Sequence, residues 1–296
     1  MSRRLAWPRR AALWLANLVA IAFLIAPLVP LVLSGVQSEK TLQGDTRALL
    51  PREYTLANFR LILSAGAQRG PIFDQVSYLP KSVERFPAAF LNSLTVGVAV
   101  TLIALALASL SAYTIARLNV RWTRTLLQMS ALSRMVPLIV LMVPLYVLFR
   151  TYGLLNSLAG VILAEVGFLI PYAIMILVPY FASFPGELED AARIDGCTRF
   201  TAFLRMILPL STPGLAACAV ILFIISWHEL LIPLILNSKT EFMTLPVVIA
   251  SLVGDVHVFF NLMMAICLLA LLPSVILVLM LQKFVVQGLS VGAIKG

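Results

Sequence analysis

The segment FPAAFLNSLTVGVAVTLIALALASLSAYTIA, residues 86–116, contains no Asp, Glu, Lys or Arg. A helix needs about 20 predominantly apolar residues to cross the hydrocarbon core of a bilayer, and this segment is longer than that. Residues 11–38 form a second segment without a charged residue. Each of the two segments predicts a membrane-spanning helix.

The composition of the whole chain agrees with a membrane protein. Of its 296 residues, 61% are hydrophobic and 12% are charged. Soluble proteins average about 45–50% apolar and about 25% charged residues. One soluble core cannot bury so large an apolar excess, so we expect an all-α protein whose solvent is lipid.

Four further apolar segments bring the predicted spans to six. Ionisable residues within a span are costly and are therefore candidates for function. Prolines recur in the spans, which is typical of a packed and kinked bundle. The further spans are residues 125–149, interrupted by Arg134; residues 158–184, with Glu165; residues 212–236, with His228 and Glu229; and residues 260–286, uncharged until Lys283.

The segment between the first two spans has a pattern of its own. Thr55 is a capping-type residue, and apolar residues come after it at helical spacing. Residues 55–63 therefore form either a short amphipathic helix on the outer surface or a mobile loop. We expect five parts in the chain: a cytoplasmic N-terminus (1–10), a peripheral first span (11–36), an extracytoplasmic segment (37–87), a core of spans two to six (88–286) that includes a loop at 183–209, and a cytoplasmic tail (287–296).

The distribution of Lys and Arg predicts the orientation. The chain has 22 Lys and Arg against 13 Asp and Glu, a net charge of +9. With a cytoplasmic N-terminus, the short outer loops carry only Arg150 and Lys239, whereas the inner segments carry most of the other basic residues. The positive-inside rule therefore places both termini in the cytoplasm. The charge excess reflects topology and predicts no nucleic-acid partner, and the three separated cysteines predict no metal site.

The cytoplasmic loop 183–209 is more than a connection between two spans. Pro185 suits the first turn of a helix. Glu187, Glu189 and Asp190 place negative charge at the positive end of the helix dipole. The sequence therefore predicts a helix that begins near Pro185.

The second half of the loop predicts the end of this helix and a further turn. Ala191 and Ala192 continue the helix with small side chains, which allow another molecule to approach closely. Gly196 supplies a left-handed residue that ends the helix. A second amphipathic turn starts at Thr198, so the loop has the form of a short helix-turn-helix shaped to dock.

The spacing in this loop resembles a known signature. Asp190-Ala191-Ala192, three residues, Gly196, nine residues and Met206-Ile207-Leu208-Pro209 resemble the EAA loop of permease subunits of bacterial ATP-binding-cassette (ABC) importers. The resemblance implies the type I ABC importer permease fold, with six transmembrane helices and a cytoplasmic coupling helix that inserts into the ATPase subunit. The family usually has Glu where this chain has Asp190, a shorter acid that weakens or redirects one ion pair. The implied ATPase-coupling residues are Glu189, Asp190, Ala191, Ala192, Gly196, Leu208 and Pro209.

Other segments resemble the carbohydrate-uptake branch of these importers, most closely its second, maltose-type permease subunit. They include residues 50–59, Asn92-Ser93, Met135-Val136-Pro137, residues 152–157 and the tail 288–296. The resemblance implies a multi-pass protein of the bacterial inner membrane that forms half of the path for a sugar, expected to be a di- or oligosaccharide.

The same resemblance implies the partners of the chain. They are two cytoplasmic ATPase subunits, a second permease subunit, an extracytoplasmic sugar-binding protein and membrane lipid. The sequence contains no GxxxxGK[ST] phosphate-binding loop. We therefore expect no enzymatic activity and no cofactor in this chain, with ATP and Mg²⁺ bound by the ATPase partners.

A polar group within the fifth span is a candidate for the substrate path. Ser226-Trp227-His228-Glu229 stands where the sugar branch usually has Trp-Asn-Glu. In one interpretation Trp227 stacks on a sugar ring in a central cavity, and His228 or Glu229 bonds to sugar hydroxyls. In the other, the four residues form a structural polar cluster that ties helices together.

Three other positions complete the set of candidates. Glu165 is expected either in the same cavity or at the outer membrane interface. Arg134 is expected to extend its side chain to the cytoplasmic interface. By resemblance, the outer loop contacts the soluble binding protein through Asn237, Ser238, Lys239 and Thr240.

The alternative function is an ion-gradient-driven secondary transporter or channel. Such a protein normally has an internal repeat and buried charges along its path, and neither is evident in this sequence. An intramembrane enzyme is disfavoured because the spans contain no HExxH, GxSxG or paired-acid pattern.

Overall fold

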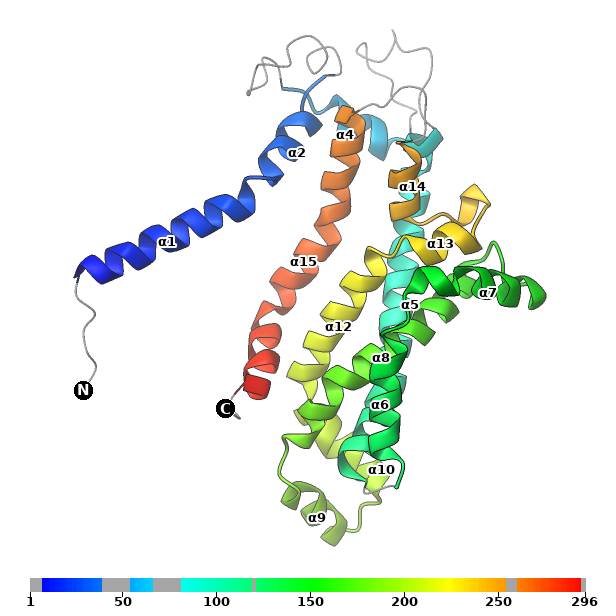
Figure 1. The fold of residues 1–296 in the computed structure, drawn as a ribbon. Coiled ribbons are helices and arrows are strands. Elements are labelled where there is room, and N and C mark those ends of the chain that lie inside the picture. The colour runs from blue at the N-terminus through cyan, green and yellow to red at the C-terminus, as the bar shows by residue number, and fades with distance from the viewer. Residues whose placement is uncertain (1–6, 39–53, 66–80, 119–120, 254–259, 294–296) are drawn as a thin grey trace. The chain divides into compact units, whose positions relative to one another are not determined.

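The computed structural model describes residues 7–38, 54–65, 81–118, 121–253 and 260–293, and within these ranges it contains helices and no β-strand (Figure 1). Three helices are each long and apolar enough to cross a membrane: α5 (Lys81–Arg117), α8 (Leu158–Ala182) and α15 (Phe260–Ala293). They correspond to the second, fourth and sixth predicted spans.

Three further candidate spans are bent pairs of helices. Two of them cover the first and third predicted spans, and one begins at Arg199, ahead of the predicted fifth span (212–236). The first pair, α1 (Trp7–Ile25) and α2 (Leu28–Gly35), is bent by 45°. Counting each pair as one span gives six spans in the described residues, in agreement with the all-α, six-helix prediction. The other pairs are α6 (Thr123–Ser133) with α7 (Leu138–Thr151), bent by 98°, and Arg199–Leu210 with α12 (Thr212–Trp227), bent by 77°.

The sharpest bend lies between α6 and α7. Pro137 precedes the first residue of α7 and has an extended backbone, with φ −62° and ψ 131°. Proline lacks the N–H that an interior helical position requires, and it disfavours helical geometry in the residue before it. The third predicted span is therefore two helices joined by a break at residues 134–137.

The fifth predicted span is also interrupted. Helix α12 ends at Trp227, and a separate short helix, α13 (Leu231–Leu236), begins after three intervening residues. The backbone of residues 228–230 lies outside both helices. The helices are thus interrupted within the third and the fifth predicted spans.

The chain forms two compact units, one comprising Met1–Pro87 with Ile249–Leu271 and the other Ala88–Val248 with Leu272–Gly296. In the first unit, α4 (Ala57–Leu63) shows that the helix, and not the loop, is the correct one of the two alternatives for residues 55–63. Asn58 fixes it there, because its Nδ2 donates to the carbonyl oxygens of Gly35, at 2.9 Å, and Gln37, at 2.8 Å. The other predicted domain boundaries stay predictions.

Close packing of α5 builds the core of the second unit. One face of α5 carries small and β-branched side chains at every fourth position, so they form a stripe along the helix. Small residues let neighbouring helices approach closely, which is how helices associate in lipid. The buried stripe consists of Val96, Val100, Ala104, Ala108 and Ala112.

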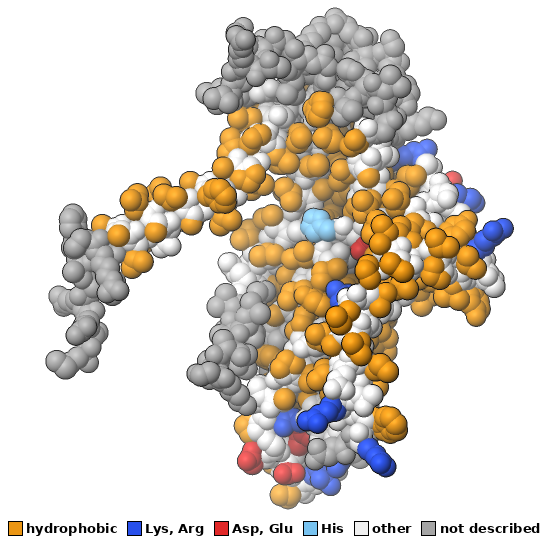
Figure 2. All heavy atoms as spheres, viewed as in Figure 1, with side chains coloured by type: hydrophobic (Ala, Val, Ile, Leu, Met, Phe, Trp, Pro, Cys, Tyr) orange, Lys and Arg blue, Asp and Glu red, His pale blue; other side chains and the backbone are white. Residues whose placement is uncertain are grey.

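Short elements connect the long helices of the second unit. After α8 come α9 (Glu187–Ile194), α10 (Arg199–Ala202), the π-helix η1 (Phe203–Ile207) and α11 (Leu208–Leu210). The 3₁₀-helix η2 (Thr240–Phe242) and α14 (Leu245–Ser251) come after α13. Helices α9 and α10 lie together at the end of this unit away from α13 (Figure 1), and charged side chains gather there (Figure 2).

Candidate functional site

The predicted docking helix in the loop after α8 is α9. It begins at Glu187, two residues later than Pro185 suggested, and the backbone N–H of Glu189 donates to the Gly186 carbonyl oxygen at 3.0 Å. Three acidic residues occupy its first turn, where the helix dipole stabilises negative charge.

The C-terminus of α9 forms a Schellman turn. Gly196 has φ +84°, which confirms the predicted left-handed residue. The N–H of Gly196 donates to the Arg193 carbonyl oxygen at 3.1 Å, and the N–H of Cys197 donates to the Ala192 carbonyl oxygen at 2.9 Å. These two bonds are the pair that defines this cap, so the end of the helix depends on Gly196.

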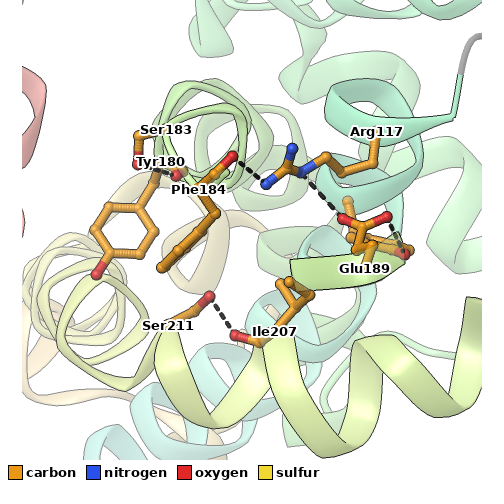
Figure 3. Close-up of polar contacts among 8 residues, drawn as sticks. Arg117, Tyr180, Ser183, Phe184, Glu189, Ile207 and Ser211 are labelled. Atoms are coloured by element: carbon orange, nitrogen blue, oxygen red, sulfur yellow. Dashed lines mark hydrogen bonds and ion pairs between the residues drawn. The ribbon is translucent and has the colours of Figure 1, made fainter. Parts of the chain in front are cut away.

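One side chain of α9 points into the unit and joins α5. The Glu189 Oε1 atom lies 3.2 Å from Arg117 Nε, and Tyr113 donates its hydroxyl to Glu189 Oε2 at 3.2 Å. Arg117 also donates through Nη2 to the carbonyl oxygen of Phe184, which lies just beyond α8, at 2.5 Å (Figure 3). The side chains of Arg117 and Glu189 are 11% and 16% exposed. One guanidinium therefore links the end of α5, the end of α8 and α9.

Aromatic packing extends this junction to the π-helix. The Tyr113 ring centroid lies 4.7 Å from that of Phe203, in η1, and 6.4 Å from that of Phe181, in α8. Phe181 and Phe203 are both buried. The polar contacts of Glu189 and Arg117 thus lie beside an aromatic cluster to which α5, α8 and η1 each contribute one ring.

The outward side of the loop is exposed and mixed in character. Asp190, Ala191, Gly196 and Pro209 of the predicted coupling set are exposed, Leu208 is half-buried, and Ala192 is buried. Beside them, Ile194 exposes 86% of its surface, the largest exposed fraction among the large apolar side chains of the described residues.

A cavity of about 320 Å³ lies among α8 and the two helix breaks. The break between α6 and α7 contributes Arg134, α8 contributes Glu165, and the end of α12 with the break after it contributes Ser226 and Glu229. The Ser226 hydroxyl donates to Glu165 Oε2, which joins α12 to α8. Glu229 Oε1 accepts from the backbone N–H groups of Leu231, at 2.8 Å, and Ile232, at 3.3 Å, and so caps α13.

The structure separates the four candidates of the fifth span. Ser226 and Glu229 line the cavity. Trp227 is buried against other aromatic rings, stacked on Phe223 at 5.6 Å and edge-on to Phe90 at 5.5 Å. His228 is exposed and is not among the residues that line the cavity.

Arg134 differs from its expected position at the cytoplasmic interface. Its Nη1 donates to the carbonyl oxygen of Phe168, in the interior of α8, at 3.3 Å, and its guanidinium lies 4.9 Å from the centroid of the Tyr172 ring. The prediction was wrong because it assumed an unbroken helix. The bend at residues 134–137 instead directs the side chain against the middle of α8.

The outer loop after α13 is held by side-chain amides. Asn237 is buried, accepting from the Ser157 N–H at 3.1 Å and donating to the Phe242 carbonyl oxygen at 2.9 Å. Asn156 Oδ1 accepts from the N–H groups of Ser238 and Lys239, both at 2.8 Å. Of the four predicted binding-protein contacts, Ser238, Lys239 and Thr240 are exposed and Asn237 lies beneath them.

A solved structure shares the fold of this chain. An ABC transporter involved in the import of the acidic polysaccharide alginate has the same fold, with a TM-score of 0.73, 18% identity, and coverage of 94% of this chain and 98% of that one. The likeness extends over nearly the whole of both chains and shows a shared fold.

Sequence relatives define the family. Residues 104–291 match the family described as binding-protein-dependent transport system inner membrane component. The trehalose transport system permease protein SugB of Mycobacterium tuberculosis is 31% identical over 97% of this chain and 99% of its own length. The diacetylchitobiose uptake system permease protein DasC of Streptomyces coelicolor is 35% identical over 69% of this chain and 74% of its own. The chain belongs to this family, which confirms the resemblance drawn from the EAA loop.

Sequence reasoning missed one group of residues at these sites and the arrangement of another. Tyr113 and Arg117 precede the docking helix by more than one whole span, and nothing in their local sequence links them to Glu189. The basic charge of Arg117 at the end of an apolar segment was the only available signal. Glu165 and Arg134 were noticed as costly charges, but their shared cavity depends on how the helices bend.

Proposed function

We propose that this chain forms half of the translocation path for a sugar, expected to be a di- or oligosaccharide, in an ABC importer. We further propose that α9 couples this path to ATP hydrolysis in a partner ATPase. Relatives named for trehalose transport and diacetylchitobiose uptake support a sugar as the transported substrate. The polar cavity supports a path, because polar groups at membrane depth are expensive unless they are used.

The observation that carries the coupling role is the two-sided character of α9. Its outer side, with Asp190, Ala191 and Ile194, is free to enter a groove on another subunit. On its inner side Glu189 is bonded to Tyr113 and Arg117 of α5. Glu189 thus holds the helix to the membrane unit, and force applied to the outer side reaches α5 through it.

The proposed assembly uses the same surfaces. Two ATPase subunits, which bind ATP and Mg²⁺, contact the α9 ends of this chain and of a second permease subunit. A soluble sugar-binding protein contacts Ser238, Lys239 and Thr240 on the opposite side of the membrane. This arrangement requires both chain termini in the cytoplasm, as the distribution of Lys and Arg predicts.

The role of α9 is tested at its glycine cap. Gly196→Val forces a β-branched residue into left-handed geometry, which costs about 1–2 kcal/mol or more. In proteoliposomes with all partners we expect ATP hydrolysis to continue while sugar uptake per ATP falls several-fold. Gly186→Ala is the matched control, because Gly186 has φ −66° and no atom within 4 Å of an added Cβ.

Two outcomes would contradict the proposal. Normal coupled uptake by the Gly196→Val transporter would remove the coupling role of α9. Uptake by ATP-depleted vesicles under a proton gradient would favour the ion-driven alternative.

A further inference from the structure

A groove of about 350 Å³ lies between α5, α12 and α15, and every residue that lines it belongs to the second unit. Phe223 of α12 is 7% exposed and forms its buried part, whereas Leu102 and Met280, which are 62% and 69% exposed, lie at its open edges. Among the described residues that line it, Thr101 alone is polar, and its hydroxyl already donates to the Gly97 carbonyl oxygen at 2.6 Å. The groove therefore suits a hydrocarbon chain and offers little to a polar molecule.

The groove lies at membrane depth. Helix α15 carries no Asp, Glu, Lys or Arg from Phe260 to Gln282, a length of about 34 Å at 1.5 Å per residue. This length matches the hydrocarbon core of a bilayer, which is about 30 Å thick, so Lys283 marks the end of that core. The lining residues of α15 lie between Pro273 and Leu281, in the half of the span nearer Lys283. At this depth the open edges of the groove meet the acyl chains of lipid.

Lys283 places a cation at the end of the groove. It follows the lining residues Ile276 and Met280 by seven and three positions, so all three lie on one face of α15. Its side chain is exposed, and its Nζ lies 4.8 Å from the centroid of the Phe284 ring. Among the described residues Lys283 forms no ion pair, and neither α12 nor α15 contains an acid. The acid of α5, Glu84, lies in the first turn of that helix, well before its groove residues, so the lysine has no counter-charge on the helices that form the groove.

We propose that this groove binds an anionic phospholipid, with one acyl chain along α5, α12 and α15 and the phosphate group at Lys283. Basic residues at the end of a membrane-spanning helix attract anionic lipids. The phosphate supplies the counter-charge that Lys283 lacks, which an apolar helix of another subunit would not. A zwitterionic lipid has the same chains but carries a cation of its own, so it binds more weakly beside a lysine. The site requires only that α15 spans the membrane, and it is independent of the proposed sugar and of the ATPase.

Native mass spectrometry of the assembled complex tests the choice of head group. The complex of this chain, its partner permease and the ATPase subunits is purified in mild detergent and titrated with dioleoyl phosphatidylglycerol or dioleoyl phosphatidylcholine, which have identical chains. We expect at least one phosphatidylglycerol to bind about fivefold more tightly than phosphatidylcholine, the effect of one lysine near an anionic membrane surface. Lys283→Gln should remove one tightly bound phosphatidylglycerol per complex, whereas Arg121→Gln, which removes an exposed arginine outside the three helices, should remove none. The proposal is overturned if the unaltered complex shows no preference, or if the two variants bind equally.

A photoreactive lipid locates the acyl chain. Phosphatidylglycerol with a diazirine in one acyl chain is added to the same complex in lipid nanodiscs and irradiated. We expect adducts on residues 94–102 and 273–281, with a severalfold lower yield there in Ala219→Phe, because Ala219 lines the groove and a larger side chain fills it. Adducts on α7, whose exposed apolar side chains lie outside the groove, measure non-specific contact with lipid. A yield in the groove no higher than on α7, or one that Ala219→Phe leaves unaltered, would contradict the site.

The alternative occupant of the groove is a helix of the second permease subunit. Ile276 lines the groove and is 53% exposed, so p-benzoylphenylalanine at this position reports what touches the groove. We expect adducts with lipid and none with protein. An adduct with the second permease subunit would show that a helix covers the groove, and it would overturn the lipid site. If the Ala219→Phe complex fails to assemble, the adducts of the unaltered complex and the Lys283→Gln titration decide.

Discussion

The ion pair between Arg117 and Glu189 provides the sharpest test of how α9 is connected to α5. Replacing Arg117 with Gln removes the Nε contact to Glu189 and the bond to the Phe184 carbonyl oxygen, which the structure gives as 3.2 Å and 2.5 Å. Glu189 then retains only the hydroxyl of Tyr113. The carboxylate is left mostly buried without a counter-charge.

The size of the effect depends on this burial. Breaking a fully buried ion pair costs about 3–5 kcal/mol, whereas an exposed pair contributes about 0–1 kcal/mol. With side chains that are 11% and 16% exposed, the pair lies closer to the buried limit, and we expect about 2–4 kcal/mol for Arg117→Gln. An interaction of that size favours the position of α9 against α5 over a detached position by a factor of about thirty or more.

The assay compares uptake with ATP hydrolysis in proteoliposomes that contain all partners. Arg117→Gln and Glu189→Gln should each lower the amount of sugar taken up per ATP hydrolysed, because α9 moves without carrying α5. The exchange Arg117→Glu with Glu189→Arg should restore part of the loss, and a double-mutant cycle should give a coupling energy of about 1–3 kcal/mol. Arg121→Gln, which removes an exposed arginine nearby, is the control.

A clear result would refute this reasoning. If both single variants transport sugar with unaltered stoichiometry, α9 does not transmit movement through Glu189. If the exchanged pair is no better than either single variant, the loss reflects damage to the local structure and the ion pair has no specific role.

Two further changes test other junctions of the second unit. Asn156→Ala removes the acceptor for two backbone N–H groups of the outer loop, each at 2.8 Å, and puts Ala at φ +53°. We expect a cost of about 1–3 kcal/mol and weaker stimulation of ATP hydrolysis by the binding protein, with Thr151→Ala as the control; normal stimulation would contradict a transmitting role for this loop. Gly214→Ala places a Cβ about 2.5 Å from the Tyr180 ring, whereas Gly167→Ala meets nothing within 4 Å. Thermal unfolding of the detergent-purified complex should therefore show a loss of about 1–3 kcal/mol only for the former, and equal midpoints would show that α12 and α8 are not closely packed there.

Local physical constraints explain why some features were predictable. Gly196 ends α9 in left-handed geometry, as predicted, because a glycine after an amphipathic turn has few alternative roles. The short helix at 57–63 formed where a capping threonine precedes an apolar repeat. In each case the signal lies within a few residues of the structure that it predicts.

The sequence by itself determined that this is an all-α membrane protein with up to six spans, because the cost of placing charge in hydrocarbon acts on each segment separately. It also determined the family, through the fixed spacing of Asp190-Ala191-Ala192 and Gly196. Only the tertiary structure decided the partner of Glu189 and the cavity around Glu165. Those depend on the 98° bend at residues 134–137 and on the packing of α8 against α5 and α12. Bends and packing bring together residues that are distant in the chain, and no local property of either partner records that they will meet.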